Sequence, residues 1–328
     1  MQSWPEIFSR FADLKVLIIG DVMVDAYIWG SVDRISPEAP VPIISVRKRD
    51  FRLGGAANVA LNVLSLGAKP ILCAIAGQDV QGNRLLHLME DKGMSKEGIV
   101  ISSTRPTTVK ARVIAAHQQI IRIDDEEDAE ATKEEESALL RKIESLMPEC
   151  QAVIFEDYDK GVITSTLIEE SVKLARKLNI PTIVDPKKRN FLHYKNVTLF
   201  KPNLKELREG LKLEIEANDQ NLVDKAVQQV KQKLNVEGVM LTLSEHGVYI
   251  DYQNQKINVA AHKREISDVS GAGDTVVSIA ALCVALHLSP EKIATLANLG
   301  GGLVCQYVGV VPVNREALLA EANELELV

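Results

Sequence analysis

Short runs of apolar, largely β-branched residues alternate with helical patterns along most of the chain, and this alternation strongly constrains the fold. Such runs are typical of strands buried on both faces of a sheet. We predict strands over Val16–Gly20, Ile71–Ala76, Val153–Phe155, Thr182–Val184, Val197–Phe200 and Val239–Leu243. Helical spacing is found at Asn58–Leu66, Arg84–Met89, Glu134–Leu146, Leu167–Leu178 and Leu222–Leu234. The pattern predicts an α/β fold, a mostly parallel sheet with helices on both faces.

Two stretches interrupt the alternation. Residues 26–49 contain three prolines among short extended pieces, and residues 107–124 read as two strands that turn near His117. Both suit a small antiparallel sheet inserted into the main domain, where it could act as a lid. We therefore expect a single domain over residues 1–328, with lid segments at approximately 22–52 and 104–124. The 328 residues, 46% of them hydrophobic, are enough for a large core.

Charge and cysteine usage exclude several classes of protein. The net charge is −7, from 38 Lys and Arg against 45 Asp and Glu, which argues against a nucleic-acid-binding surface. The four cysteines are widely spaced and form no C-x-x-C pair, as expected for buried thiols of a cytoplasmic protein. Near the start, polar residues interrupt the apolar stretch that a signal peptide needs, so we expect no signal peptide. The most apolar later stretch, Val276–Leu288, falls short of the roughly 20 residues that span a bilayer and predicts a buried helix.

The usual nucleotide-binding signatures are absent. No G-x-x-x-x-G-K-[ST] motif occurs, so the chain is not a P-loop kinase. The first predicted strand ends in Gly20-Asp21 but is not followed by the G-x-G-x-x-G of dinucleotide-binding proteins. Any phosphate-binding site in this chain must therefore be of another kind.

The segment Asp268-Val-Ser-Gly-Ala-Gly-Asp274 precedes an apolar helix and offers such a way. Backbone N–H groups at a helix N-terminus bind phosphate, and glycines let phosphate oxygens approach closely. The helix dipole would also stabilise Asp274 as an anion in the first turn. Alternatively, the segment is only the cap of a buried helix whose glycines serve packing. This motif alone does not decide between the two.

A second glycine motif, Leu53-Gly-Gly-Ala-Ala-Asn-Val-Ala60, opens an earlier helix. The two motifs in this order resemble both signatures of the ribokinase (PfkB-type) family of sugar kinases, and the resemblance covers essentially the whole chain. It implies a Rossmann-like ribokinase fold with a β-sheet lid, and use of ATP and Mg²⁺. It also implies that Asp274 is the catalytic base and that Gly271, Ala272 and Gly273 form an anion hole for the transferred phosphoryl group.

The resemblance implies roles for further residues. Asp25, Gly55 and Asn58 would bind the acceptor, although Asp25 could instead be a turn residue. Asn203 would face the phosphates and Glu206 would hold Mg²⁺ through water, although the two could be a plain helix cap. The expected nucleotide contacts are Asn203, Thr242, Ser244, Gly247, Gly273 and Asn298. Asp268 and Ser270 match positions that hold a monovalent cation in some relatives, which leaves a need for K⁺ open.

Residues 34–42 and 108–113 look like the D-glycero-D-manno-heptose 7-phosphate kinases, which phosphorylate the C1 hydroxyl on the way to ADP-heptose for lipopolysaccharide. Many of these carry a fused nucleotidyltransferase domain, and we expect the kinase alone here. Thr108, Lys110 and Arg112 alternate and so face one side of a strand. We assign Lys110, Arg112, Lys160 and Lys187 to the sugar phosphate, with solvated surface cations as the alternative. Arg34 and Glu38 are further candidates for contacting the sugar.

Two other functions are compatible with these motifs. The acceptor could be a fructose phosphate or a nucleoside, as in other ribokinase-type enzymes. The chain could also be a non-catalytic sugar-binding regulator, although the residues expected to be catalytic are all present. We expect small-molecule partners only, with no nucleic acid and no membrane, and a homodimer formed through the lid sheet.

Overall fold

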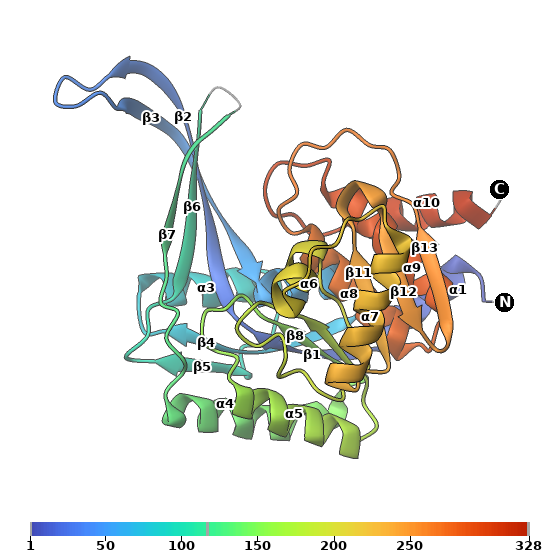
Figure 1. Cartoon of the computed structure of the whole chain (residues 1–328). Helices are drawn as coiled ribbons and strands as arrows, with labels where there is room; N and C mark the ends of the chain where they lie inside the picture. Colours follow the sequence, from blue (N-terminus) through green and yellow to red (C-terminus); the bar gives the residue numbers. More distant parts are fainter. Residues whose placement is uncertain (1, 116–117, 327–328) are drawn as a thin grey trace.

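The computed structural model describes residues 2–115 and 118–326. Within these residues nine strands form a large sheet (Figure 1). In spatial order they are β13 (Gln255–Val259), β12 (Val248–Tyr252), β11 (Gly238–Thr242), β10 (Leu199–Phe200), β9 (Thr182–Asp185), β8 (Ala152–Glu156), β1 (Lys15–Gly20), β4 (Lys69–Gly77) and β5 (Ile99–Ser102). Strands β11 to β5 in this order pair in parallel, whereas β12 and β13 add an antiparallel edge.

Helices cover both faces of the large sheet, as predicted. Each face of the sheet packs into its own hydrophobic core, because side chains alternate along a strand. In β1, Val16 and Ile18 enter one core, and Leu17 and Ile19 enter the other. The first core is completed by α1 (Trp4–Arg10), α2 (Ala56–Ser65), α3 (Val80–Asp91), α8 (Ala272–Ala285), α9 (Pro290–Val304) and α10 (Arg315–Glu326). The second core is completed by α4 (Lys133–Leu146), α5 (Ser165–Lys177), α6 (Leu204–Leu211) and α7 (Gln220–Leu234). Short 3₁₀ turns lie at η1 (Phe11–Asp13), η2 (Met147–Glu149) and η3 (Ser244–His246).

The predicted core strands are all present, with one shorter than expected. The predicted strand over Val197–Phe200 is reduced to Leu199–Phe200. Just before Leu199, the backbone N–H groups of Thr182 and Thr198 each donate to the other residue's hydroxyl oxygen at 3.1 Å. The sequence did not predict the β12–β13 hairpin or helix α10, whereas the resemblance implied a helix at Asn298, which is α9. The predicted buried helix is α8, which is buried from Asp274 to Val284.

A second sheet of four strands projects from the body as the expected lid (Figure 1). Its order is β3 (Pro42–Gly55), β2 (Val22–Ile35), β6 (Thr108–Ala115) and β7 (Gln118–Asp125). The prediction of an antiparallel lid is wrong at its centre, because β2 and β6 pair in parallel. The chain returns to the body between β3 and β6, so β2 and β6 leave the body in the same direction. The turn predicted near His117 lies outside the described residues.

All four cysteines are buried and free of disulfides, as predicted. Across the described part of the chain, no helix has both the length and the apolar character needed to cross a bilayer.

Candidate active site

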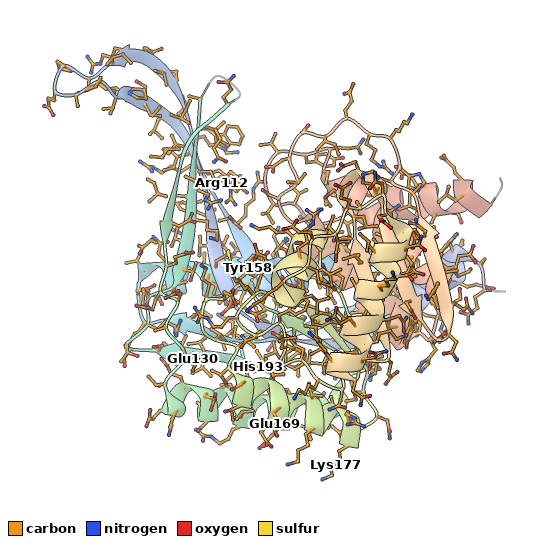
Figure 2. The ribbon with its side chains drawn as sticks, viewed as in Figure 1. Arg112, Glu130, Tyr158, Glu169, Lys177 and His193 are labelled. Atoms are coloured by element: carbon orange, nitrogen blue, oxygen red, sulfur yellow. The ribbon has the colours of Figure 1, made fainter. Side chains whose placement is uncertain are left out.

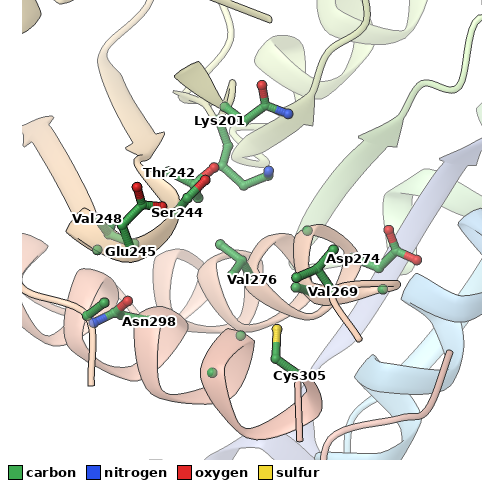
Figure 3. Close-up of a pocket in the computed structure, with 18 of the residues that line it drawn as sticks. Lys201, Thr242, Ser244, Glu245, Val248, Val269, Asp274, Val276, Asn298 and Cys305 are labelled. Carbon is green, nitrogen blue, oxygen red and sulfur yellow. The ribbon is translucent and has the colours of Figure 1, made fainter. Parts of the chain in front are cut away.

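A cavity of about 710 Å³ lies where the parallel strands β9, β10 and β11 reach their carboxyl ends, beside α8 and α9 (Figure 3). This edge is where open α/β sheets bind ligands. Figure 3 shows Asp274 at one end of the cavity and Asn298 at the other. Eleven of the residues proposed from the sequence line it: Lys187, Asn203, Glu206, Thr242, Ser244, Gly247, Gly271, Ala272, Gly273, Asp274 and Asn298.

The N-terminus of α8 forms part of the cavity wall. Gly271 caps the helix with φ +81°, a left-handed conformation that favours glycine. The N–H of Ala272 donates to the carbonyl oxygen of Val269 at 3.3 Å, so one of the three N–H groups expected to face phosphate already has a protein partner. Gly273 and Asp274 follow in the first turn, where N–H groups have no acceptor within their own helix.

Asp274 is buried and held by two hydrogen bonds. Its Oδ1 accepts a hydrogen bond from the Tyr158 hydroxyl at 2.8 Å, and its Oδ2 accepts one from Nδ2 of Asn58 at 2.7 Å. Burial raises the pKa of Asp274, and the two hydrogen bonds only partly oppose this. We expected the helix dipole to keep this carboxylate reliably ionised. Burial opposes this stabilisation, and its effect on the pKa is larger than that of the two hydrogen bonds.

A cluster of paired charges lies deeper in the cavity. Nζ of Lys187 lies 2.5 Å from Oε1 of Glu206 and 3.5 Å from Oδ1 of Asp185. Nζ of Lys201 lies 2.9 Å from Oδ2 of Asp185, and both side chains are almost fully buried. Burial would raise the pKa of Asp185, but the two lysines outweigh it and the pKa is lowered. Sequence reasoning missed Asp185 and Lys201, although each stands at the carboxyl end of a core strand.

Glu156, the last residue of β8, is a second group that the sequence did not predict. It is fully buried, and neither carboxyl oxygen has a hydrogen-bond partner among the described residues. Burial raises its pKa well above the usual range, and the nearby carboxylates of Asp185 and Asp274 add to this. Burial and the neighbouring carboxylates therefore favour the neutral form of Glu156. The signal for it was a single acid at the end of an otherwise apolar strand.

Asn203 and Glu206 form the helix cap that the sequence offered as one interpretation, and both also line the cavity. They form a reciprocal cap of α6, because the N–H of Glu206 donates to Oδ1 of Asn203 and the N–H of Asn203 donates to Oε2 of Glu206, both at 2.8 Å. The other oxygen of Glu206 pairs with Lys187 in the cavity. The cap thus fixes a carboxylate at the cavity wall.

The first glycine of the second motif makes room for Asp25. A Cβ atom on Gly54 would overlap the Asp25 carboxylate, and Gly55 has φ +58° at the start of α2. Asp25 is buried and forms an ion pair with Arg112, which lies on the neighbouring lid strand. Figure 2 shows Arg112 on the lid and Tyr158 beneath it in the body.

Two other predicted cations meet at one carboxylate. Nζ of Lys110 on β6 lies 3.1 Å from Oε2 of Glu126, and Nζ of Lys160 lies 2.7 Å from its Oε1. Lys110 also pairs with Asp124 at 3.3 Å. Lys110 and Lys160 are mostly shielded from solvent, so they are not freely solvated surface cations.

Arg34 and Glu38 are not brought to the cavity. They are exposed at the tip of the β2–β3 hairpin, which points away from the body (Figure 1). The backbone N–H of Glu38 donates to Oγ of Ser36 within the same turn. In one chain these two residues therefore lie apart from Asp274.

At the opposite end of the cavity, Nδ2 of Asn298 donates to the carbonyl oxygen of Ala260 at 2.8 Å. Thr242, Ser244 and Gly247 lie at the β11–β12 turn nearby. The sequence did not predict the neighbouring wall residues His262, Lys263 and Arg264. They belong to an irregular segment that follows β13 and carries no motif.

Asp268 is satisfied by its own surroundings. Its Oδ1 accepts hydrogen bonds from the N–H and hydroxyl of Ser270 at 3.0 and 2.9 Å, and its Oδ2 accepts one from the N–H of Gly309 at 2.8 Å. Burial would raise its pKa, but these hydrogen bonds outweigh it and the pKa is lowered. Over residues 2–115 and 118–326, no group of three or more His, Cys, Asp or Glu side chains is arranged to hold a metal ion by itself.

Curated relatives align with nearly the whole chain. The bifunctional protein HldE of Desulfatibacillum aliphaticivorans is 38% identical over 317 residues, which cover 96% of this chain and 64% of that protein. The bifunctional protein HldE of Wolinella succinogenes is 38% identical over 304 residues, which cover 92% and 63%. The chain thus spans less than two thirds of the length of these relatives.

Solved structures show the same fold at low identity. Phosphofructokinase-2 from Escherichia coli in complex with substrates and products has a TM-score of 0.77 at 20% identity, covering 95% of this chain and 99% of that one. Arabidopsis thaliana ribokinase complexed with ribose and ATP has a TM-score of 0.71 at 18% identity, covering 93% and 98%. The ribokinase-like fold predicted from the sequence is therefore confirmed. Because residues 13–317 also match the model of the pfkB family carbohydrate kinases, the chain belongs to this family of phosphotransferases.

Proposed function

We propose that this protein transfers the γ-phosphoryl group of ATP to the C1 hydroxyl of D-glycero-D-manno-heptose 7-phosphate, forming the 1,7-bisphosphate for ADP-heptose synthesis. The main support is Asp274, a carboxylate at the N-terminus of α8 that Asn58 and Tyr158 hold in place. It lies at the end of the cavity opposite Asn298 (Figure 3). The resemblance of residues 34–42 and 108–113 to heptose 7-phosphate kinases supports the choice of acceptor.

In this mechanism Asp274 accepts the proton of the C1 hydroxyl as that oxygen attacks the γ-phosphorus. Phosphoryl transfer depends mostly on positioning and charge stabilisation, so a weak base is sufficient. Gly271 and the first turn of α8 would stabilise charge on the transferred group through backbone N–H donors. The nucleotide would extend along Thr242, Ser244 and Gly247 toward Asn298.

The charged cluster suits a nucleotide that arrives with Mg²⁺. Protein sites often supply one or two carboxylates to Mg²⁺ and leave the other positions to phosphate oxygens and water. Glu206, and with it Asp185, would hold the ion beside Lys187. Bound Mg²⁺ would neutralise charge that develops on the phosphates. A monovalent cation near Asp268 and Ser270 stays a prediction.

The lid carries cations suited to a second phosphate. Lys110 and Lys160 come from different segments, and both pair with Glu126. The Glu126 carboxylate thus lies between two ammonium groups, where another anion could bind. An acceptor phosphate could replace Glu126 there, while Asp25 and Asn58 accept and donate hydrogen bonds to sugar hydroxyls. This arrangement favours a phosphorylated acceptor over a nucleoside.

A panel of acceptors with ATP tests the proposal. The panel contains heptose 7-phosphate, the unphosphorylated heptose, fructose 6-phosphate, ribose and a nucleoside. We expect kcat/KM to be highest for heptose 7-phosphate and at least about tenfold lower without the phosphate. Rapid turnover of ribose or the nucleoside, with none of heptose 7-phosphate, would refute the substrate. ATP binding without transfer to any acceptor would favour a sugar-binding regulator.

We also propose that the lid sheets of two copies pack together. Apolar side chains are exposed on the lid strands and on the β2–β3 turn, namely Val32, Ile35, Val41, Val46, Ile120, Ile121 and Ile123. Ile121 and Ile123 are two residues apart on β7 and so share one face of the sheet. A second copy of the lid would remove this apolar surface from water.

A further inference from the structure

The loop that follows β8 is fixed by a buried carboxylate. Asp21 accepts three backbone hydrogen bonds, from the N–H of Tyr158 to Oδ2 at 2.8 Å, of Lys160 to Oδ2 at 3.2 Å, and of Val162 to Oδ1 at 3.1 Å. Asp21 itself is almost fully buried at the end of β1. The backbone of Tyr158 is therefore held in place by a side chain at the carboxyl end of β1.

The side chain of Tyr158 connects the two sides of the cavity. Its hydroxyl donates to Oδ1 of Asp274 at 2.8 Å, and Nζ of Lys187 lies 5.4 Å from the centroid of its ring. Lys187 in turn pairs with Glu206. Tyr158 thus contacts the side chain proposed as the base and also the cation proposed to face the phosphates.

We propose that Tyr158 is a positioning residue for Asp274, whose hydroxyl orients the carboxylate and stabilises its ionised form. This inference rests on the proposed role of Asp274 as the base. With Tyr158 on Oδ1 and Asn58 on Oδ2, both oxygens are held and rotation about the carboxylate bond is restricted. Each oxygen keeps further lone pairs for an acceptor hydroxyl.

The chemistry of a phenol suits this role. Burial, together with the neighbouring Asp274, raises the pKa of Tyr158 well above its usual value, so the hydroxyl keeps its proton and remains a donor. A hydrogen bond to a buried anion stabilises the charged form and opposes the effect of burial on the pKa of Asp274. Without this donor, Asp274 would hold its proton up to a higher pH.

Tyr158→Phe tests the proposal, because it removes only the hydroxyl. We expect kcat to fall about 10- to 100-fold, the effect of losing one hydrogen bond to a charged group, with the KM for ATP within about twofold. The acid limb of the kcat/KM profile should move to higher pH, since Asp274 must be ionised to act. A second variant carries 3,5-difluorotyrosine at position 158. It keeps the ring, and its hydroxyl is a stronger hydrogen-bond donor, so the acid limb of the profile should move to lower pH.

Tyr194→Phe is the matched control. Tyr194 is also fully buried, and its hydroxyl donates at the same 2.8 Å to a carboxylate, Oδ2 of Asp157, that does not line the cavity. This variant should leave the pH profile unchanged even if it lowers the melting temperature. An equal shift in both variants would show that Tyr158 matters only for folding and would overturn the proposal.

A double-mutant cycle separates this proposal from the proposed function. If Tyr158 acts through Asp274, Tyr158→Phe should have little further effect on residual turnover in the Asp274→Asn background. Full activity of Asp274→Asn would refute the base itself. An inactive Asp274→Asn together with a wild-type rate and pH profile for Tyr158→Phe would leave the base in place and overturn only the inference about Tyr158.

Discussion

The charged groups at the cavity end of the large sheet are almost fully buried, whereas those toward the outer strand of the lid are partly exposed to water. In the core, the side chains of Lys201 and Asp185 are 2% and 5% exposed. On the lid, Lys110 and Glu126 are 15% and 26% exposed, and Arg122 is 53% exposed. Buried pairs have fixed geometry and are costly to break, while exposed pairs exchange partners readily. The core is therefore suited to holding side chains still, whereas the ion pairs of the lid are freer to change partners.

The largest effect should come from the core. Asp274→Asn is expected to lower kcat by about 10²- to 10⁴-fold, because it removes the proposed base while keeping the shape of the side chain. ATP binding, measured by calorimetry, should be retained. Circular dichroism checks that the variant is folded. Unchanged turnover would contradict the assignment of Asp274 and the contrast between core and lid.

Breaking the buried ion pair should cost stability. Lys201→Met leaves Asp185 with only the longer pair to Lys187, and we expect the free energy of unfolding to fall by about 3 kcal/mol. Lys256→Met is the control, because Lys256 is 46% exposed in its pair with Asp224. This variant should lower the free energy of unfolding by less than about 1 kcal/mol. Urea denaturation measures both. Equal losses would mean that burial does not distinguish the two pairs.

Glu156 gives a pH-dependent test of the core. Its pKa is raised in the folded protein, so the folded state binds this proton more tightly than the unfolded chain does. The resulting stability is present at low pH and is lost as the pH rises through the folded pKa. In Glu156→Gln this loss does not occur. We therefore expect the free energy of unfolding of the variant to rise by about 1–3 kcal/mol relative to that of the wild type as the pH rises.

Urea denaturation over a range of pH measures this gain. Glu149→Gln serves as the control, because Glu149 is exposed and its pKa is lowered by a hydrogen bond from Lys15. A stability difference between Glu156→Gln and the wild type that does not change with pH would show that Glu156 is not held as the neutral acid.

On the lid the effect should appear in binding rather than in turnover. Lys110→Ala is expected to raise the KM for heptose 7-phosphate about tenfold with kcat within about twofold, because a phosphate contact distant from the reacting atoms contributes equally to the ground and transition states. Arg122→Ala, which removes an exposed cation from the adjacent strand, should leave KM unchanged. A fall in kcat alone would place Lys110 with the core residues.

The smallest effect on turnover should come from the outer lid. Ile121→Asp puts a charge into the apolar face proposed to pair with a second copy, and we expect weaker self-association in sedimentation velocity. Leu213→Asp introduces the same kind of change at an exposed position outside the lid and should leave association unchanged. A monomeric wild type at micromolar concentration would contradict the proposed dimer.

Much of the fold could be predicted from local patterns. The runs that became β1, β4, β8, β9 and β11 are apolar on both faces, and such runs are stable only inside a covered parallel sheet. The β12–β13 hairpin was missed because it lies outside that alternation, at the edge of the sheet. The parallel pairing of β2 with β6 was missed because it joins segments separated by a passage through the body.

Eleven of the 26 residues that line the cavity were also predicted, because motif residues adjoin strand ends and helix starts. Asp185, Lys201, Glu156 and Tyr158 were not, since their importance comes from neighbours distant in the sequence. Arg34 and Glu38 show the converse, because their motif does not bring them to the cavity of their own chain.

The sequence by itself determined the layered α/β architecture and the presence of a lid, because hydrophobic periodicity acts locally. Only the tertiary structure decided which charges meet and which state each one adopts. The balance at Asp274 is the clearest case. Its place at a helix N-terminus is visible in the sequence, but burial and the donors Asn58 and Tyr158 set its pKa, and these depend on how the sheet, the helices and the loop after β8 pack together.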